Sequence, residues 1–425
     1  MNLICRPASL QGSLNAIPSK SDAHRKLICA ALSQNGGCLP IFQPFCDDIA
    51  ATIRCLTALG ASFQQTENGL FVSPIQEQPH AGLDCGESGS TLRFLLPVAM
   101  CVCKNISVTG SGRLPERPIS VLTDEMSAHG VQFSAKSLPI SAAGRLTGGL
   151  YEIPGNISSQ FLSGLLMALP LCDQDSKIRL TTPLQSAAYV DMTLDTLREF
   201  GVAVEISDEG GLLSYDIKGK QILQFPNQIR VDGDWSNAAF WLTAGAIQSS
   251  GAITLRGLHS DSVQGDKEIT HILKSVGADF QVHENEIIVS CGTIKKFDVS
   301  MREIPDLLPI LAILAAVSDG ESHFLNAERL RLKESDRLQS TADMLRALGG
   351  NVDEHDDGLT VYGGQLNGGT VNAQNDHRLV MAAAVAALRC KSPVRILGAE
   401  AVNKSYPAFF DDYRALGGIA EAEPE

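Results

Sequence analysis

The sequence predicts a mixed α/β (α+β) protein of two domains, each assembled from three repeated units of about 70 residues. Two independent markers show this period along the 425 residues. Polar residues open six short apolar helices at intervals of 69, 69, 77, 70 and 70 residues: Ser21, Ser90, Ser159, Ser236, Asp306 and Asp376. Glycines end six amphipathic helices at intervals of 70, 71, 76, 72 and 68 residues: Gly60, Gly130, Gly201, Gly277, Gly349 and Gly417. Because both markers keep the same period, they indicate one repeated structural unit.

The first unit predicts the order helix, strand, helix, strand, strand. Residues Ser21–Ser33 form an apolar stretch rich in small side chains, and Gly37–Phe42 is typical of a short strand. Apolar residues recur at helical spacing through Cys46–Leu59, and two further strands are expected at Ala61–Gln64 and Leu70–Ser73. We expect the other five units to repeat this pattern.

The recurring helices fall into two sets. One set is apolar nearly all round and is therefore expected to be buried beneath the sheets: Ser90–Cys103, Ser159–Leu171, Ser236–Ile247, Pro305–Val317 and Asp376–Leu388. The other set is amphipathic and expected to be partly exposed: Ile119–His129, Asp191–Phe200, Asp266–Val276, Ser335–Leu348 and Phe409–Leu416. A buried helix must bring its polar first turn to a surface, and that surface is the predicted functional site.

The spacing also predicts where the chain passes between domains. The only irregular interval, 77 residues, surrounds Gln224–Asp234, so we place a crossover there. A strand at Asn2–Leu14 precedes the first helix and is expected to complete a unit at the C-terminal end. One domain would then be discontinuous, comprising residues 1–16 and 233–425, and the other would comprise residues 17–232. We expect the active site in the cleft between them.

Composition narrows the class of protein. The net charge of −14 argues against nucleic acid as a partner, because polyanion binding needs a basic surface. The 11 cysteines, among them Cys29, Cys101 and Cys390, include no CxxC pair and are typical of buried thiols in a reducing compartment. Residues 1–7 lack the apolar run of a signal peptide, and no stretch approaches the ~18 apolar residues of a membrane span. We therefore expect a cytoplasmic monomer with small-molecule substrates and no membrane partner.

The first helix start indicates an anion site. Lys20 lies just before the first turn, and Ser21 and Arg25 share one helix face. The helix macrodipole opposes cations at an N-terminus by ~0.3–1 kcal/mol, and a bound anion would remove that conflict. The alternative is an exposed basic turn, and these residues alone do not decide between the two.

Two further helix starts offer neutral hydrogen-bonding groups. The segment around Gly89 combines glycines with hydroxyl groups, which lets backbone N–H groups approach a ligand, although such turns also simply cap helices. Arg117 precedes another helix and is a candidate phosphate ligand or a surface ion-pair residue.

The next unit contains the uncharged segment Ser158-Ser159-Gln160, which suits either the recognition of ligand oxygen atoms or plain helix capping. Ser186 and Tyr189 precede a helix of the same unit, where Tyr189 is either a ligand or an aromatic at the core edge.

The C-terminal half supplies candidate acids and more cations. Asp306 opens an apolar helix and is either a capping aspartate or, if buried near the site, a general base. Residues 329–337 contain six charged groups in nine positions at a helix entrance, which favours function over a solvated face. Counting across the helix starts gives seven cations: Lys20, Arg25, Arg117, Lys333, Arg337, Arg378 and Lys404. Seven cations suit two anionic small molecules that bind side by side. Asp306 and Glu334 are the obvious acids for proton transfer.

Five motifs in this chain occur in a family-specific order. Between Pro18 and Pro407 the chain contains Ser-Lys-Ser-x-x-x-Arg, Glu-Arg-Pro, Ser-Ser-Gln-Phe, Lys-Glu-Ser-Asp-Arg and Asn-Asp-His-Arg. With this ordered set it resembles the 5-enolpyruvylshikimate-3-phosphate synthases of the shikimate pathway. The resemblance implies a two-domain inside-out α/β barrel, each domain having three βαβαββ units, with substrates bound between domains that close on binding.

The resemblance also implies ligand sets. Shikimate 3-phosphate would contact Lys20, Ser21, Arg25, Ser158, Ser159, Gln160, Ser186, Tyr189, Asp306 and Lys333. Phosphoenolpyruvate would contact Lys20, Gly89, Arg117, Gln160, Arg337, His377, Arg378 and Lys404. The inhibitor glyphosate would occupy the phosphoenolpyruvate position. The chain departs from common family patterns at Glu87-Ser88-Gly89-Ser90, where many relatives have Asn-Ala-Gly-Thr, and at Arg329, where some have asparagine.

The reaction implied by the family fits these residues. The enolpyruvyl group of phosphoenolpyruvate is transferred to the 5-hydroxyl of shikimate 3-phosphate by addition and elimination, with release of phosphate, on the route to chorismate and aromatic amino acids. An acid and a base must exchange roles, and the candidates are Asp306 and Glu334, with Lys20 and Lys333 stabilising developing charge. We expect no cofactor and no metal, since no His, Cys or Asp cluster has ligand spacing.

Two alternatives belong to other functional classes. The sister enzyme that transfers enolpyruvate to UDP-N-acetylglucosamine shares the fold but typically has a cysteine in the loop corresponding to Gly110–Pro118, which contains none here. A non-catalytic anion-binding repeat protein would keep the cations without needing Asp306 and Glu334.

Overall fold

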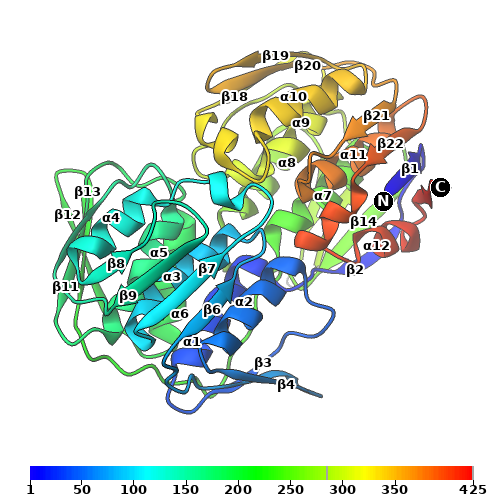
Figure 1. Ribbon diagram of the computed structural model, residues 1–425. Helices are drawn as coiled ribbons and strands as arrows, with labels where there is room; N and C mark the ends of the chain where they lie inside the picture. Colours follow the sequence, from blue (N-terminus) through cyan, green and yellow to red (C-terminus); the bar gives the residue numbers. More distant parts are fainter. Residues whose placement is uncertain (284–285, 424–425) are drawn as a thin grey trace. The chain divides into compact units, whose positions relative to one another are not determined.

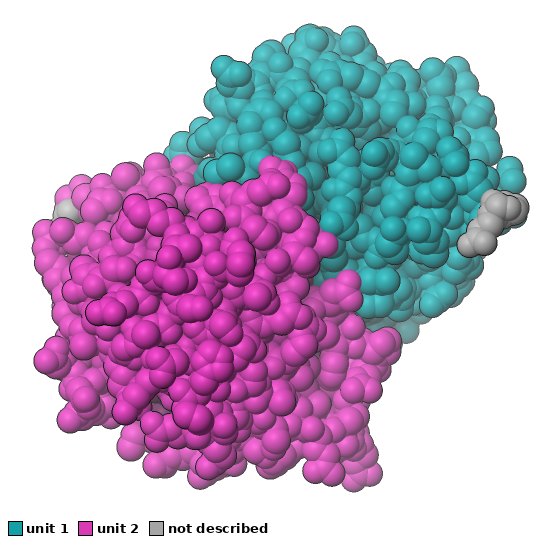
Figure 2. Space-filling view, viewed as in Figure 1, with its two compact units in different colours: residues 1–19, 232–425 teal, residues 20–231 magenta. Residues whose placement is uncertain are grey.

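The computed structural model describes residues 1–283 and 286–423, and the chain divides into two compact units. Unit 1 comprises residues 1–19 and 232–425, and unit 2 comprises residues 20–231 (Figure 2). Each unit has its own hydrophobic core, that of unit 1 running from Leu3 to Ala420 and that of unit 2 from Ala23 to Leu223.

The helices of unit 2 alternate with strands along the chain (Figure 1). Its helices are α1 (Lys20–Leu32), α2 (Asp47–Ala58), α3 (Gly89–Val102), α4 (Ser120–Ala128), α5 (Ser159–Ala168) and α6 (Ala187–Glu199), with 3₁₀ turns η1 (Leu114–Glu116) and η2 (Leu169–Leu171). Its strands are β3 (Gly37–Leu39), β4 (Ser62–Thr66), β5 (Gly69–Ser73), β6 (Ala81–Asp84), β7 (Asn105–Thr109), β8 (Val131–Phe133), β9 (Ile140–Gly144), β10 (Leu150–Ile153), β11 (Ser176–Leu180), β12 (Val204–Glu209) and β13 (Leu212–Ile217).

Unit 1 has the same alternation and more 3₁₀ turns. Its helical elements are α7 (Trp235–Ile247), η3 (Gly265–Glu268), α8 (Ile269–Ser275), η4 (Pro305–Leu307), α9 (Leu308–Ala316), η5 (Glu328–Leu332), α10 (Arg337–Ala347), α11 (His377–Ala386), η6 (Ala387–Arg389), η7 (Ala399–Lys404) and α12 (Phe409–Ala415). Its strands are β1 (Asn2–Arg6), β2 (Gly12–Asn15), β14 (Ala252–Arg256), β15 (Asp279–Val282), β16 (Glu286–Ser290), β17 (Asp298–Ser300), β18 (Glu321–Leu325), β19 (Asn351–His355), β20 (Gly358–Tyr362), β21 (Gly369–Asn372), β22 (Val394–Leu397) and β23 (Ile419–Ala422).

The repeat is visible in the sheets. In the order β6-β7-β9-β8, the first two strands are parallel, with Leu83 opposite Val108, and the other pairs are antiparallel. The orders β10-β11-β13-β12 and β17-β18-β20-β19 repeat this arrangement. Because α3 joins β6 to β7 and α4 joins β7 to β8, the unit is βαβαββ, as predicted. One repeat of unit 2 differs, since its sheet, β3-β5-β4, has three strands.

The N-terminal segment completes two sheets of unit 1. Strand β1 lies between β22 and β23, and β2 pairs in parallel with β14. The predicted single strand Asn2–Leu14 is therefore wrong, because Pro7 has no N–H for a sheet ladder and Gly12 has φ +135°. Residues Asn2–Arg6 and Ile419–Ala422 are thus held in one sheet, β21-β22-β1-β23.

The apolar helices are buried, as their sequence predicts. All nine residues of α9 and all ten of α11 are buried, as are 12 of the 13 residues of α7. In unit 2, α5 is buried except at Gln160. Gly164 lies where α5 meets α3, because a β-carbon placed there would be 2.2 Å from the carbonyl oxygen of Arg93. The two helices therefore approach more closely than a side chain at position 164 would allow.

Four helices are capped by a polar side chain at a predicted start, Asp376, or one or two residues before the predicted starts Ser90, Ser159 and Ser236. The side chain of Ser88 accepts a hydrogen bond from a backbone N–H of α3, and Ser158, Asp234 and Asp376 do the same for α5, α7 and α11. Asp306 is different. It lies inside η4, and no side chain caps η4 or α9. The capping interpretation of Asp306 is therefore wrong.

The close packing of α3 on α5 gives a stability prediction. Gly164→Ala should destabilise unit 2 by about 1–3 kcal/mol, because the added methyl group must push against backbone that is fixed by helix hydrogen bonds. Urea unfolding measures the change. Gly82→Ala is the matched control, since a β-carbon on β6 meets only the Ser107 hydroxyl at 3.6 Å. Equal stability of the two variants would contradict this account of the helix contact.

Candidate functional site

Arg337 is the centre of a charged cluster in unit 1. Its side chain is 1 % exposed, and its guanidinium donates to Asp306 at 2.7 Å and to Asp376 at 2.9 Å, as well as to Glu334. Burial alone would lower the pKa of Arg337, but the carboxylates of Asp376, Glu334 and Asp306 raise it above its ordinary value. The guanidinium joins η4, the segment before α10 and the start of α11 through one set of contacts.

The carboxylate of Asp306 is shared by three cations. Arg378 donates to it at 2.9 Å, Arg337 at 2.7 Å and Lys333 at 3.4 Å. Burial acts to raise the pKa of Asp306, but Arg378, Lys333 and Arg337 hold it well below its ordinary range. Asp306 is therefore ionised at neutral pH, and its environment changes if a cation is drawn away.

The charged run 329–337 separates into two groups. One group belongs to the Arg337 cluster: Lys333 and Arg337 pair with Asp306, and Glu334 pairs with Arg337. Arg331 instead pairs with Asp336 and Glu354, and the guanidinium of Arg329 donates to the carbonyl of Arg302. Only the first group belongs to the cluster, because η5 ends at Leu332 and Lys333 is extended.

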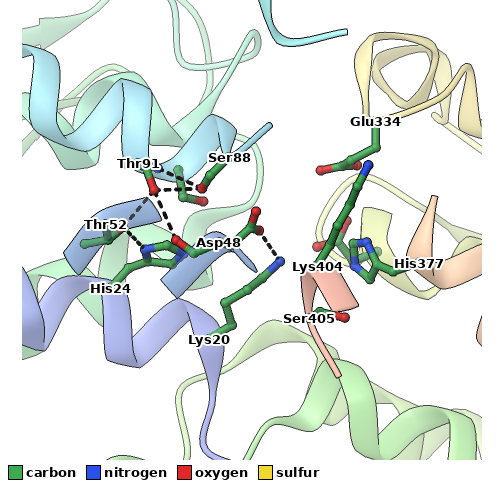
Figure 3. A network of polar contacts seen from close by, with 12 residues as sticks. Lys20, His24, Asp48, Thr52, Ser88, Thr91, Glu334, His377, Lys404 and Ser405 are labelled. Atoms are coloured by element: carbon green, nitrogen blue, oxygen red, sulfur yellow. Dashed lines mark hydrogen bonds and ion pairs between the residues drawn. The ribbon is translucent and has the colours of Figure 1, made fainter. Parts of the chain in front are cut away.

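The turn before α11 brings Lys404 and His377 to the same region of unit 1. Gln374 and Asn375 have φ values of 48° and 57°, and the Asn375 carbonyl accepts a hydrogen bond from Lys404 at 2.6 Å. His377 is buried, and its ring lies 3.9 Å from the Asp376 carboxylate. Figure 3 shows Glu334, His377 and Lys404 as sticks.

A second buried acid lies beside this cluster. Asp266, on η3, is 1 % exposed, accepts a hydrogen bond from Ser236, and has no hydrogen-bond partner for Oδ1. Burial raises the pKa of Asp266 to about 6, with a further rise from Asp306 and a decrease from Arg378. In the sequence, Asp266 is only the first residue of a predicted amphipathic helix, and nothing there indicates a role at the site.

Unit 2 has its own cluster, centred on Arg25. The side chain of Arg25 donates to the Thr193 hydroxyl at 2.8 Å, the Ser21 carbonyl at 2.6 Å and the Tyr189 carbonyl at 2.7 Å. Burial lowers the pKa of Arg25 to about 10, so it remains protonated at neutral pH. These three acceptors are uncharged, so they satisfy the guanidinium without neutralising it. Such a cation suits an anionic ligand.

Lys20 is held by a buried polar network (Figure 3). Its ammonium group donates to Asp48 at 2.6 Å. Behind it, His24 Nδ1 contacts the Thr52 hydroxyl, Thr52 contacts Thr91, and Thr91 donates to the Ser88 hydroxyl, with distances of 2.7, 2.7 and 2.8 Å. Burial, Lys20 and Arg25 lower the pKa of His24 well below its ordinary value, so His24 is neutral. The network joins the starts of α1, α2 and α3.

Gln160 connects the starts of α3 and α5. It accepts from Arg93 at 2.7 Å and donates to the Ser90 hydroxyl at 2.9 Å. Gly89 faces Arg117, because a β-carbon at Gly89 would be 2.6 Å from the Arg117 guanidinium. The glycine thus permits the guanidinium to lie against the backbone at the α3 start.

The predicted residues are divided between the two units, and most of them lie at or near helix starts, whereas Lys404 ends η7 and Lys333 directly follows η5. In unit 2 these are Lys20, Ser21, Arg25, Gly89, Arg117, Ser158, Ser159, Gln160, Ser186 and Tyr189, and in unit 1 they are Asp306, Lys333, Glu334, Arg337, His377, Arg378 and Lys404. The sequence reasoning missed residues whose importance lies in contacts with other segments: His24, Asp48, Thr52, Thr91, Arg93 and Asp266. Only Arg93 gave a signal, as a cation in the Gly89 segment.

Comparisons with known proteins identify the family to which the chain belongs. A family model described as EPSP synthase (3-phosphoshikimate 1-carboxyvinyltransferase) matches residues 4–413. The 3-phosphoshikimate 1-carboxyvinyltransferase of Clostridium kluyveri is 41% identical over 97% of this chain and 96% of its own length, and that of Clostridium novyi is 40% identical over 99% and 98%. The chain belongs to the EPSP synthase family.

Solved structures agree with this assignment. The EPSP synthase of Acinetobacter baumannii superimposes with a TM-score of 0.80 at 25% identity, covering 99% of this chain and 100% of that one. The enolpyruvyl transferase NikO of Streptomyces tendae, at 16% identity and a TM-score of 0.77 over 99% and 98%, shares the fold.

The described residues contain neither a metal-binding cluster of His, Cys, Asp or Glu side chains nor a helix that could span a membrane. Between residues 1 and 423, apart from 284 and 285, no group of three His, Cys, Asp or Glu side chains is arranged to hold a metal ion. Within the same part of the chain, none of the helices has both the length and the apolar character needed to traverse a bilayer.

The buried Asp266 gives a pH prediction. Its pKa is higher in the folded chain, about 6, than in the unfolded chain, about 3.9, so the folded state binds more protons between these values. Its contribution to the free energy of unfolding is complete at low pH and is lost as pH rises through this window. Asp266→Asn has no proton to lose there, so between pH 4 and 7 its stability relative to wild type should rise by up to about 3 kcal/mol.

Unfolding by urea at pH 4, 5, 6 and 7 measures this difference. Ser236→Ala is the companion variant, because the Ser236 hydrogen bond lowers the pKa of Asp266 and its loss should move the window to higher pH. A stability difference between wild type and Asp266→Asn that does not change with pH would contradict the assignment.

Proposed function

We propose that this chain transfers the enolpyruvyl group of phosphoenolpyruvate to the 5-hydroxyl of shikimate 3-phosphate, releasing phosphate. The observation that supports this best is the Arg337 cluster, in which two acids, Asp306 and Glu334, contact one buried cation and Asp306 also contacts Lys333. A site that only bound anions would gain nothing from two carboxylates among its cations. Membership of the EPSP synthase family supports the same reaction.

Shikimate 3-phosphate is assigned mainly to the helix starts of unit 2. The Arg25 guanidinium rests on neutral oxygens and therefore retains its full charge for a phosphate. Ser158 and Ser159 at the start of α5 add hydroxyl and backbone N–H groups at the positive end of a helix dipole. Ser186, Tyr189 and Gln160 complete this part of the site, and Asp306 and Lys333 of unit 1 are assigned to the hydroxyl that reacts.

Phosphoenolpyruvate is assigned to cations from both units. Arg117 at the Gly89 turn, together with Lys20 and Gln160, would hold it from unit 2. Arg337, Arg378, His377 and Lys404 would hold it from unit 1. We propose that the two units form the walls of one cleft, because each supplies only part of each ligand set.

The chemistry follows from the state of the acids. Attack of the 5-hydroxyl on C2 of phosphoenolpyruvate requires a proton acceptor, while C3 must receive a proton. Asp306 is ionised and therefore able to accept a proton, and Glu334 lies on the other side of the same guanidinium. Elimination of phosphate removes the C3 proton again, so acid and base exchange roles. Lys20 and Lys333 stabilise charge that develops on phosphate and on the attacking oxygen.

Phosphate release is the direct test of this function. The purified protein is mixed with phosphoenolpyruvate and either shikimate 3-phosphate or UDP-N-acetylglucosamine, and inorganic phosphate is measured over time. We expect release with shikimate 3-phosphate and none with the nucleotide sugar. Release with the nucleotide sugar alone would identify the sister reaction, and release with neither would favour a binding protein.

Replacing either acid should impair turnover. Asp306→Asn and Glu334→Gln keep the side-chain shape but remove proton exchange, so kcat should fall by ~10²-fold or more. Calorimetry should still detect ligand binding by the Glu334 variant. Glu328→Gln removes the same charge from an exposed position on η5 and should leave kcat near the wild-type value. Near-normal kcat in both acid variants would refute their roles.

The Gly89 turn should distinguish glyphosate from phosphoenolpyruvate. A methyl group at position 89 would displace the Arg117 guanidinium, which lies 2.6 Å from that point. Gly89→Ala should therefore raise the inhibition constant of glyphosate more than the KM for phosphoenolpyruvate, because glyphosate is the longer ligand and has less free space in the same pocket. Steady-state inhibition assays measure both constants, with Gly82→Ala as the control. Equal inhibition constants in wild type and Gly89→Ala would show that this placement is wrong.

Ligands should draw the two units together. Without substrates, cations of both units repel each other across the proposed cleft, and two anions would reverse that repulsion. Small-angle scattering should show a smaller radius of gyration when shikimate 3-phosphate and glyphosate are both added. The Asp306→Asn, Arg25→Ala double variant, which lacks groups from both walls, should compact less. A radius unaffected by ligands in the wild type would rule out closure.

A further inference from the structure

Two cysteine side chains of unit 2 are in contact through their sulfur atoms. Cys101, in the last turn of α3, and Cys172, directly after η2, are separated by 71 residues, yet their Sγ atoms are 3.9 Å apart. Cys101 Sγ also donates to the Ala168 carbonyl at 3.4 Å and Cys172 Sγ to the Leu146 carbonyl at 3.5 Å. Packing of α3 on α5 and η2 therefore creates a thiol pair that sequence spacing does not reveal.

The pair lies at the edge of the hydrophobic core of unit 2, where Cys172 is one of the core residues and Cys101 packs against them. Cys101 is partly exposed, contrary to the expectation of a buried thiol, and Cys172 is 4 % exposed. A surface hollow of about 490 Å³ is lined by Val102, Leu171 and Arg145, the first two being sequence neighbours of the cysteines. Arg145 also donates to the Cys101 carbonyl at 3.3 Å. The hollow thus reaches the chain neighbours of both cysteines, and a small uncharged oxidant would enter past them.

The two thiols are not equivalent. The hydrogen bond with Cys101 lowers the pKa of Cys172 despite partial burial, whereas the same contact and burial raise the pKa of Cys101. Cys172 is thus the thiol that ionises first, and the thiolate is the form that reacts with oxidants. Its neighbour is within reach to resolve an oxidised sulfur, which is the usual arrangement of a redox-sensitive pair.

We propose that Cys101 and Cys172 form a redox-sensitive dithiol that a peroxide converts to a disulfide. The Cys172 thiolate attacks one oxygen of hydrogen peroxide, the O–O bond breaks, and the departing hydroxide takes up a proton to give water and a Cys172 sulfenic acid. The Cys101 sulfur then attacks the Cys172 sulfur, the S–O bond breaks, and a second water leaves with the Cys101 proton. Two thiols lose two electrons, and the peroxide gains them.

The bond would connect elements that matter for the site. It would join the carboxyl end of α3 to the segment after α5, the two helices whose amino ends contain Gly89 and Ser159. The S–S bond requires the sulfur atoms to approach to about 2.05 Å, which side-chain rotation at two chain positions near element ends can provide. Closing a loop of this length restricts the unfolded chain and should stabilise unit 2.

The chain contains its own matched control pair. Cys55 on α2 and Cys85 after β6 are hydrogen-bonded to each other, but both are completely buried. The contact with Cys55 and burial raise the pKa of Cys85, and neither cysteine of this pair is exposed. Exposed Cys291 reports on the reactivity of an isolated thiol in the same molecule.

The test uses the full chain, fully reduced and then treated with a small molar excess of hydrogen peroxide. Free thiols are blocked, the protein is digested without reduction, and peptides are mapped by mass spectrometry. We expect a peptide linked through Cys101 and Cys172 that disappears after dithiothreitol, with Cys55 and Cys85 unlinked. Absence of that peptide, or equal linkage of the control pair, would overturn the proposal.

Single variants test the order of events. Cys101→Ser should trap the sulfenic acid on Cys172, detected as a dimedone adduct, whereas Cys172→Ser should give little adduct on Cys101. The reverse pattern would overturn the assignment of Cys172 as the attacking thiol. Oxidised wild type should also melt about 5 °C or more above the reduced protein, reversibly. Complete linkage with an unchanged melting temperature would overturn the inferred stabilisation.

Discussion

The buried guanidinium of Arg337 is the interaction on which the chemistry of unit 1 depends. It is 1 % exposed and contacts three carboxylates, one of them, Asp376, completely buried. Removing one partner from a buried charge cluster typically costs about 3–5 kcal/mol, because the remaining charges lose their compensation. Arg337 therefore fixes η4, α10 and α11 relative to one another, and together with Arg378 and Lys333 it keeps the pKa of Asp306 low. Structure and reactivity rest here on the same contacts.

The two units use their helix starts in different ways. In unit 2 the buried cations Arg25 and Arg93 are satisfied largely by hydroxyl, amide and carbonyl oxygens, which leaves their charge available to a ligand. In unit 1, Lys333, Arg337 and Arg378 contact the carboxylate of Asp306, which holds a protonatable group in a fixed position. This contrast fits the proposed division of labour, in which one unit mainly binds a phosphate and the other mainly moves protons.

Several helix starts were predicted correctly because capping is a local interaction. Ser158 and Asp376 accept hydrogen bonds from N–H groups within three residues, so the sequence pattern alone identifies them. Asp306 was ambiguous for the same reason, since an aspartate after a proline looks like a cap. Its partners Arg337 and Arg378 lie 31 and 72 residues away, and only the folded chain brings them together.

The sequence by itself determined the repeat, the burial of the apolar helices and the family, because periodicity, apolar composition and ordered motifs are properties of the chain as written. Tertiary structure decided what the repeat could not. It split the N-terminal segment between two sheets, linked His24 to Ser88 through two threonines, and placed Asp266 beside Asp306. It also put Cys101 against Cys172. Each of these outcomes depends on distances between residues far apart in the chain, and those distances are set by packing rather than by local sequence.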